Sequence, residues 1–274
     1  MMKNMTRPKL HHYVPRFYLE RFTDNLGYLW VWDREKDRVF RSSPNNVAAE
    51  SHFYRLDQYA HYAVDADVEL ERQLSVIEAD ISIITTQWLD WLRNGQKLDR
   101  LTIPEENRRG FSLFVALQIL RTADHRSLVE AFLEERNDID SAMNAEQRAT
   151  EIRRFHTEIL WNAEAVDNLS EKIYQSIWLF AKNPTDTQFV TSDNPVTFRT
   201  ADNKMWVKLG FFRDGTYAAF PIAPDIIIYM YPRHEMWKSL EKFDCQISPV
   251  VLTSEMVISE NTACVYGFEI YFFK

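Results

Sequence analysis

The feature that most constrains the fold is a long stretch of helical periodicity between Asp65 and Gly95. Its apolar residues recur at steps of three and four, at positions 70, 74, 77, 81, 84, 88 and 92. This spacing places them on one face of an amphipathic helix of roughly seven or eight turns, and Asn94–Gly95 suits its C-terminal end. Such a helix must bury its apolar face against other elements of the fold.

A second helix is predicted from Thr102 to about Asn137. Thr102 and Glu105 have the spacing of a capping box, and Pro104 suits the first helical turn. The run from Phe111 to Leu120 is apolar on nearly all faces, which predicts a central place in the core. A third helical region spans roughly Glu146 to Ala181.

The segments on either side of these helices are strand-like. We expect strands at residues 28–33, 39–41, 52–55, 188–191, 196–198, 218–222, 226–231 and 263–266, and a short helix at 255–261. The first two strands form a hairpin. Strand-rich ends around a helical block of about 65–181 predict an α+β fold, with a mixed sheet built from N- and C-terminal strands packed on a central block of three long helices. We expect a single domain over residues 1–274.

The overall charge narrows the classes of partner. The chain of 274 residues has a net charge of −8, which disfavours broad binding to duplex nucleic acid but leaves room for a local basic pocket. The first ten residues lack the apolar region of a secretory signal, and the apolar run 111–120 is too short to span a bilayer. The cysteines at 245 and 264 have no metal-site spacing and are expected to be reduced. A cytoplasmic protein with no membrane partner is expected.

The N-terminal stretch Leu10–Phe17 places two adjacent histidines in an apolar, aromatic segment. Adjacent residues of a strand point to opposite faces, so one of His11 and His12 should face inward and the other outward. Each ring titrates near neutral pH and is usable as an acid, a base or a metal ligand. The alternative is a structural histidine whose hydrogen bonds are satisfied in the core.

Two other stretches carry candidate site residues. Gln118, Arg121, Thr122 and His125 have the spacing of one helix face, so a guanidinium there either clamps an anion or holds protein carbonyls and carboxylates. The segment Ser192–Asp193–Asn194–Pro195 follows an expected strand and is either a plain turn or a site. As a site, Asp193 is a base, a metal ligand or the group that orients a histidine.

Several of these stretches also occur together in a known family. The segments HHYVPRFYLERF, SSPNNVAAESHFY, LQILRT, FVTSDNPVTF and NTACVY resemble the DUF4238 family over nearly the whole chain. The resemblance implies one full-length domain and assigns no activity. Its motif positions fall on His11, His12, Tyr13, Pro15, Gln118, Arg121, Thr122, Ser192, Asp193, Asn194 and Pro195. The chain departs from the pattern at Ala123–Asp124, where relatives tend to have a proline after the Arg–Thr pair.

These observations lead to two hypotheses about function. The first is a hydrolase, such as a nuclease, for a phosphodiester or nucleotide: His11 or His12 and Asp193 are catalytic, while Gln118, Arg121, Thr122, Ser192 and Asn194 bind the substrate anion. The second is a non-catalytic ligand- or partner-binding module in which the polar cluster is structural. A divalent metal held by a histidine and Asp193 is a third, weaker alternative. No nucleotide-cofactor motif occurs, and the expected partner is a small anionic ligand or the end of a nucleic acid.

Overall fold

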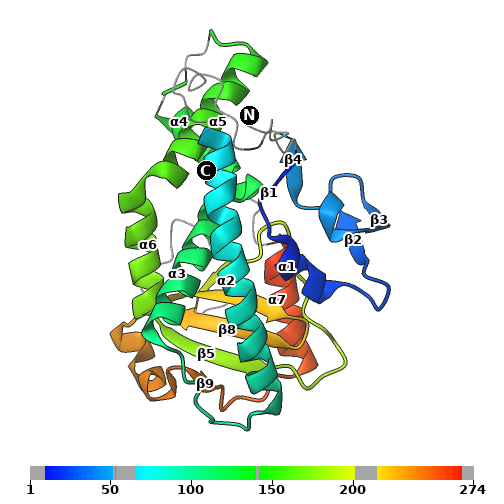
Figure 1. The fold of residues 1–274 in the computed structure, drawn as a ribbon, viewed down its shortest axis with the longest axis vertical. Helices are drawn as coiled ribbons and strands as arrows, with labels where there is room; N and C mark the ends of the chain where they lie inside the picture. The colour runs from blue at the N-terminus through cyan, green and yellow to red at the C-terminus, as the bar shows by residue number, and fades with distance from the viewer. Residues whose placement is uncertain are drawn as a thin grey trace, which may run out of the picture.

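A five-stranded mixed sheet carries most of the core in the computed structural model, which describes residues 10–51, 53, 66–136, 138–139, 142–200 and 215–266 (Figure 1). Its strands are β5 (Ile177–Lys182), β6 (Thr197–Thr200), β7 (Thr216–Ala223), β8 (Ile226–Tyr231) and β9 (Gln246–Ile247). They lie in the order β6-β7-β8-β5-β9, and all neighbours are antiparallel except β5 and β9. The predicted α+β class and the mixed sheet are confirmed.

Helices cover both faces of this sheet. On one face, α2 (Ala66–Asn94) and α3 (Glu105–Leu120) pack against β5, with Trp88 and Phe111 in ring contact with Trp178. On the other face, α7 (Ser254–Tyr266) and the 3-10 helix η5 (Glu235–Phe243) cover the alternate residues of the same strands, among them Leu179. Because both faces are covered, the central strands are apolar throughout, and β7 is buried along its whole length.

The prediction of three long helices is wrong in number, although α2 ends before Gly95 as expected. The second region breaks after Leu120 into α3 and α4 (Ala123–Glu135), and the third comprises α5 (Ala145–Trp161), α6 (Ala163–Gln175) and then strand β5. Each break has a capping residue: Thr122 accepts a hydrogen bond from the backbone N–H of His125, and Asn162 accepts one from that of Ala165.

The predicted capping box at Thr102 is also wrong. Pro104 has extended backbone angles and occupies the cap position itself, so Glu105 is the first residue of α3 and not its third. The side chain of Pro104 makes no capping hydrogen bond, and the first turn of the helix contains Glu105 and Glu106. The negative charges of these glutamates stabilise the helix, because its N-terminal end is the positive end of the helix dipole.

The N-terminal strands were expected in the main sheet, and this prediction is wrong. β1 (Leu10–His12) pairs with β4 (Ala49–Ser51), and the predicted hairpin is β2 (Leu29–Asp33) with β3 (Arg38–Ser42); each pair forms a separate two-stranded sheet beside α2 (Figure 1). Among the described residues, the N-terminal strands pair only with one another, so the main sheet consists of strands from residue 177 onward. Between them lies a short 3-10 turn, η2 (Pro44–Asn46).

Two other predicted strands are not formed, and a third lies mostly outside the described residues. Residues 263–266 belong to the end of α7, so the strand expected there is wrong. Residues 188–191 form an extended segment and no strand; it is held by the N–H of Phe189, which donates to the carbonyl of Pro224, and by the side chain of Asn261. Of the strand expected at 52–55, only Phe53 lies among the described residues.

The first helix ties the N-terminal segment to the sheet. Short helix α1 (Arg16–Leu19) continues as the 3-10 helix η1 (Glu20–Phe22). The hydroxyl of Tyr18, which is buried, donates to the carbonyl of Pro221 at 2.7 Å, 203 residues later in the chain. Its ring packs against Phe220 of β7, with centroids 5.2 Å apart.

Among the described residues, no helix combines the length and the apolar character needed to cross a membrane. Both cysteines are buried free thiols, as expected.

Candidate functional site

The two adjacent histidines face in opposite directions, as the alternation predicts. His11 pairs with Glu50 of β4 in register and is buried at 1% exposure, with its Nδ1 3.9 Å from a carboxylate oxygen of Glu71. The half-buried His12 instead has its Nε2 3.2 Å from the carbonyl of Asn45. Burial lowers the pKa of His12 and Arg16 lowers it further, against the raising effects of the Asn45 carbonyl and Glu78.

Tyr13, the residue after His12, joins the N-terminal segment to α3. The side-chain amide of Gln118 donates to the backbone carbonyl of Tyr13 at 3.0 Å. Arg121 donates twice to Gln118 Oε1, at 3.2 Å from Nε and 2.8 Å from Nη2, and its Nη1 donates to Glu78 at 2.7 Å. Arg121 is 1% exposed. The guanidinium predicted as a candidate anion clamp therefore lies inside a chain of hydrogen bonds linking β1, α2 and α3.

Thr122 and His125 do not continue the helix face of Gln118 and Arg121. The break after Leu120 makes Thr122 the N-cap of α4, and its hydroxyl is used there. His125 lies beside His156 of α5, with ring centroids 5.7 Å apart, and His156 Nε2 is 2.8 Å from the carbonyl of Leu120. The predicted four-residue face is thus divided between two elements.

The segment Ser192–Asp193–Asn194 forms a local turn. The Ser192 hydroxyl donates to the carbonyl of Asn194 at 3.0 Å and accepts from the Asn194 N–H at 3.1 Å. Asn194 is buried at 2% exposure, and neither its Oδ1 nor its Nδ2 has a hydrogen-bond partner among the residues that the structure describes. Asp193 is exposed. The turn thus combines an exposed carboxylate with a buried side-chain amide that no other described residue bonds.

Tyr13 brings the three predicted stretches into one region. Burial raises the pKa of its phenol well above the ordinary value, and the charges of Asp193 and then Glu50 raise it further, while Arg126 lowers it. Tyr13 thus interacts with α3 through the hydrogen bond from Gln118 to its carbonyl, and with Asp193 through the effect of that charge on its phenol. The N-terminal segment therefore contacts α3 directly, and the charge of Asp193 acts on the same tyrosine.

The pair Glu50–Arg126, which the sequence reasoning missed, borders an open cleft. Arg126 donates to Glu50 from Nη2 at 2.5 Å and from Nη1 at 3.3 Å, and its guanidinium lies 4.3 Å from the ring centre of Phe53. The cleft has a volume of about 410 Å³. It is lined by Glu50, Arg126, Ser127, Glu130, Ala145, Arg148, Ala149, Ile152 and Arg153. The arginines along α5 were the available signal, but partners on other elements cannot be read from spacing.

No group of three or more His, Cys, Asp or Glu side chains suited to a metal ion occurs among the described residues. The His–Asp metal alternative thus lacks a complete set of protein ligands in that part of the chain.

Comparisons with known proteins agree with the sequence motifs. No curated protein and no solved structure matches the chain. One family model does, described as protein of unknown function (DUF4238), and its match includes the histidine segment, the Gln118–Arg121 helix and the turn at Asp193. Since that match covers residues 10–264 of 274, the chain belongs to the DUF4238 family.

Proposed function

We propose that this chain is a non-catalytic ligand-binding module in which the cluster of Gln118, Arg121 and Glu78 is structural. The observation that carries the proposal is the state of Arg121, a buried guanidinium with three nitrogens already donating to Gln118 and Glu78. Three of its five N–H groups are used inside the protein, and at 1% exposure the guanidinium is not accessible to a substrate. Its role is to hold β1 and α2 against α3, and ligand binding falls to the open surface around it.

A cytoplasmic location is part of this proposal. The free, buried thiols of Cys245 and Cys264 support it, because reduced cysteines are the usual state in a reducing compartment.

The test combines catalysis with stability. Purified protein is assayed for hydrolysis of RNA, DNA and nucleotides, with and without added divalent metal, and Arg121→Ala is compared with wild type in thermal melting. We expect no turnover and a much lower Tm for the variant. Hydrolysis that co-purifies with the wild-type protein and disappears in a site variant would refute the non-catalytic assignment.

The second candidate function is a hydrolase acting on a phosphodiester or nucleotide, and the amide of Asn194 favours it. Neither atom of this buried side-chain amide is hydrogen-bonded within the described part of the chain, which costs free energy, and functional sites commonly retain such a cost when a ligand satisfies the group. In this reading His12 is the acid or base, with His11 as the other candidate. Asp193 orients the histidine or binds a metal, and Ser192 and Asn194 contact the substrate.

This candidate is tested with His12→Ala and Asp193→Ala in the same hydrolysis assay. Asp186→Ala is the matched control, because Asp186 is an exposed aspartate in the preceding loop. Loss of activity in the first two variants alone supports the hydrolase, and unchanged activity in both dismisses this site.

A further inference from the structure

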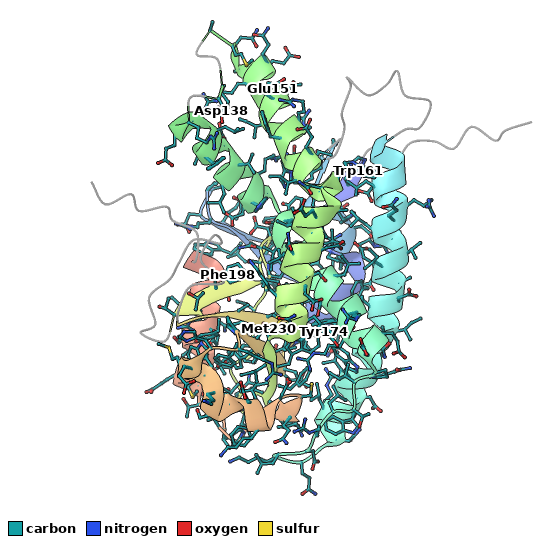
Figure 2. The ribbon with its side chains drawn as sticks, turned by 90° about the vertical axis from the view of Figure 1, so that its left-hand side faces the viewer. Asp138, Glu151, Trp161, Tyr174, Phe198 and Met230 are labelled. Carbon is teal, nitrogen blue, oxygen red and sulfur yellow. The ribbon has the colours of Figure 1, made fainter. Side chains whose placement is uncertain are left out.

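The open cleft bordered by Glu50 and Arg126 lies between three elements. One wall is α4, which contributes Arg126, Ser127 and Glu130, and the other is the first half of α5. Glu50 of β4 also lines the cleft. Figure 2 shows α4 and α5 side by side and away from the sheet, with Asp138 beyond the end of α4 and Glu151 within α5. Ala145 and Ala149 are small, so the α5 wall leaves room for a ligand.

The three arginines of the cleft differ in whether a carboxylate pairs with them. Arg126 is paired with Glu50, and Arg148 is paired with Glu130 and Glu134. Arg153 has neither a hydrogen-bond nor an ion-pair partner among the described residues, and its Nε is buried. A guanidinium that is partly desolvated and unpaired is unfavourable unless an anion compensates it.

The paired arginines retain donors as well. Arg126 uses Nη1 and Nη2 on Glu50 and keeps its Nε–H, whereas Arg148 uses Nε and Nη2 and keeps its Nη1. With the whole guanidinium of Arg153, the cleft offers donors from three side chains on two helices. Glu134, which pairs with Arg148 from outside the lining, balances the third arginine, so an anion is attracted by the unpaired guanidinium of Arg153 and not by an excess of positive charge.

We propose that this cleft binds a small phosphomonoester, with Arg153 as its principal anion-binding residue. The inference rests on the proposed binding function and names its ligand class. A phosphate has three outer oxygens that accept from several donors at once, which matches three separate arginines better than the two oxygens of a carboxylate do. The volume of about 410 Å³ accommodates a group the size of a nucleotide and excludes a polymer as the whole ligand.

The test is isothermal titration of the full chain with AMP, inorganic phosphate, acetate and adenosine at low salt. We expect saturable binding of AMP, weaker binding of phosphate, and none of adenosine or acetate. Binding should weaken as salt is added, because the attraction is largely between charges. Equal binding of AMP and adenosine would overturn the anion assignment.

Arg153→Ala is expected to weaken AMP binding at least about tenfold, as befits lost hydrogen bonds to a charged group. The matched control is Arg154→Ala, which removes the same charge from the next residue; Arg154 is paired with Glu151 and Glu158 and does not line the cleft. Its Kd should stay within about twofold of wild type. The same Kd for both variants would overturn the proposal.

Two further variants guard against loss of folding. Arg153→Lys keeps the positive charge but loses the planar set of N–H donors of the guanidinium, so an affinity for AMP between those of wild type and Arg153→Ala is expected. Ala149→Leu fills the cleft without changing charge and should also weaken AMP binding; normal affinity in a folded Ala149→Leu protein would place the ligand elsewhere. Hydrolysis of AMP by wild type would refute the non-catalytic function and leave the cleft assignment standing, whereas absent AMP binding would remove only the cleft assignment.

Discussion

The side-chain amide of Gln118 donates a hydrogen bond to the backbone carbonyl of Tyr13 across 105 residues of sequence. Its oxygen meanwhile accepts from Arg121, so both ends of one amide are used. Gln118 is fully buried. Hydrogen bonds therefore connect Tyr13, just after β1, with α3 and Arg121. Substitutions in this cluster should lower the free energy of unfolding.

Arg121→Ala should lower the free energy of unfolding by about 3–5 kcal/mol, because it leaves Glu78 and Gln118 without their buried partner. Urea denaturation measures this loss. Arg109→Ala is the control: Arg109 is half exposed and pairs with Glu105, so its removal should cost less than about 1 kcal/mol. Equal losses would show that the Arg121 cluster is not a structural tie.

Tyr18→Phe should lower the free energy of unfolding by about 1–2 kcal/mol. The substitution removes the hydroxyl that donates to the Pro221 carbonyl and leaves that buried acceptor unsatisfied, while keeping the ring packing. Denaturant titration tests the value. Tyr28→Phe, at an exposed tyrosine, should have almost no effect; a neutral result for Tyr18→Phe would mean that water replaces the lost bond.

His12 should make stability depend on pH. Its pKa in the folded chain is lower than the ordinary 6.5, so below that pH the unfolded chain binds the proton more readily than the folded chain does. The contribution of His12 is thus fully present above about pH 6.5 and declines as pH falls below it. The loss of unfolding free energy between about pH 7.5 and pH 5.5 should be smaller in His12→Gln than in wild type.

The exposed His234 provides the control for this measurement, since His234→Gln also removes one imidazole. Identical pH dependence in wild type and His12→Gln would show that the folded chain does not disfavour the protonated ring.

Both thiols should be unreactive in the folded protein. Burial raises the pKa of Cys245 and of Cys264 to about 11, aided by Asp244 for Cys245 and by Asp193 and Glu260 for Cys264. Very little thiolate is then present at neutral pH. Titration with a chromogenic disulfide reagent near pH 8 should show slow labelling of native protein and two rapid equivalents after unfolding in urea. Rapid native labelling would indicate that the segments covering the thiols open.

Local features of the fold were predictable, and features set by distant partners were not. The period of α2, the hairpin and the opposite faces of His11 and His12 follow from neighbouring residues alone. The break at Thr122 was missed because neither a glycine nor a proline stands between the end of α3 and the start of α4. The apolar stretch at 177–181 was misassigned because a buried strand and a buried helix share that composition.

The same division applies to the site. The meeting of Gln118 with Arg121 follows from a three-residue spacing on one helix. The partner Glu78, the pair Glu50–Arg126 and the lack of a partner for Arg153 among the described residues all depend on how separate elements pack. No spacing within one segment encodes those relationships.

The bond from Tyr18 to Pro221 has a consequence for synthesis on the ribosome. The first helix emerges early, but the carbonyl that it needs lies 203 residues further on, in the third strand of the sheet along the chain. The N-terminal segment must therefore wait, with its aromatic rings exposed, until most of the chain has been translated. Nascent protein stalled before β7 would keep Tyr18 accessible to chaperones and proteases, and would become resistant only when that strand is released.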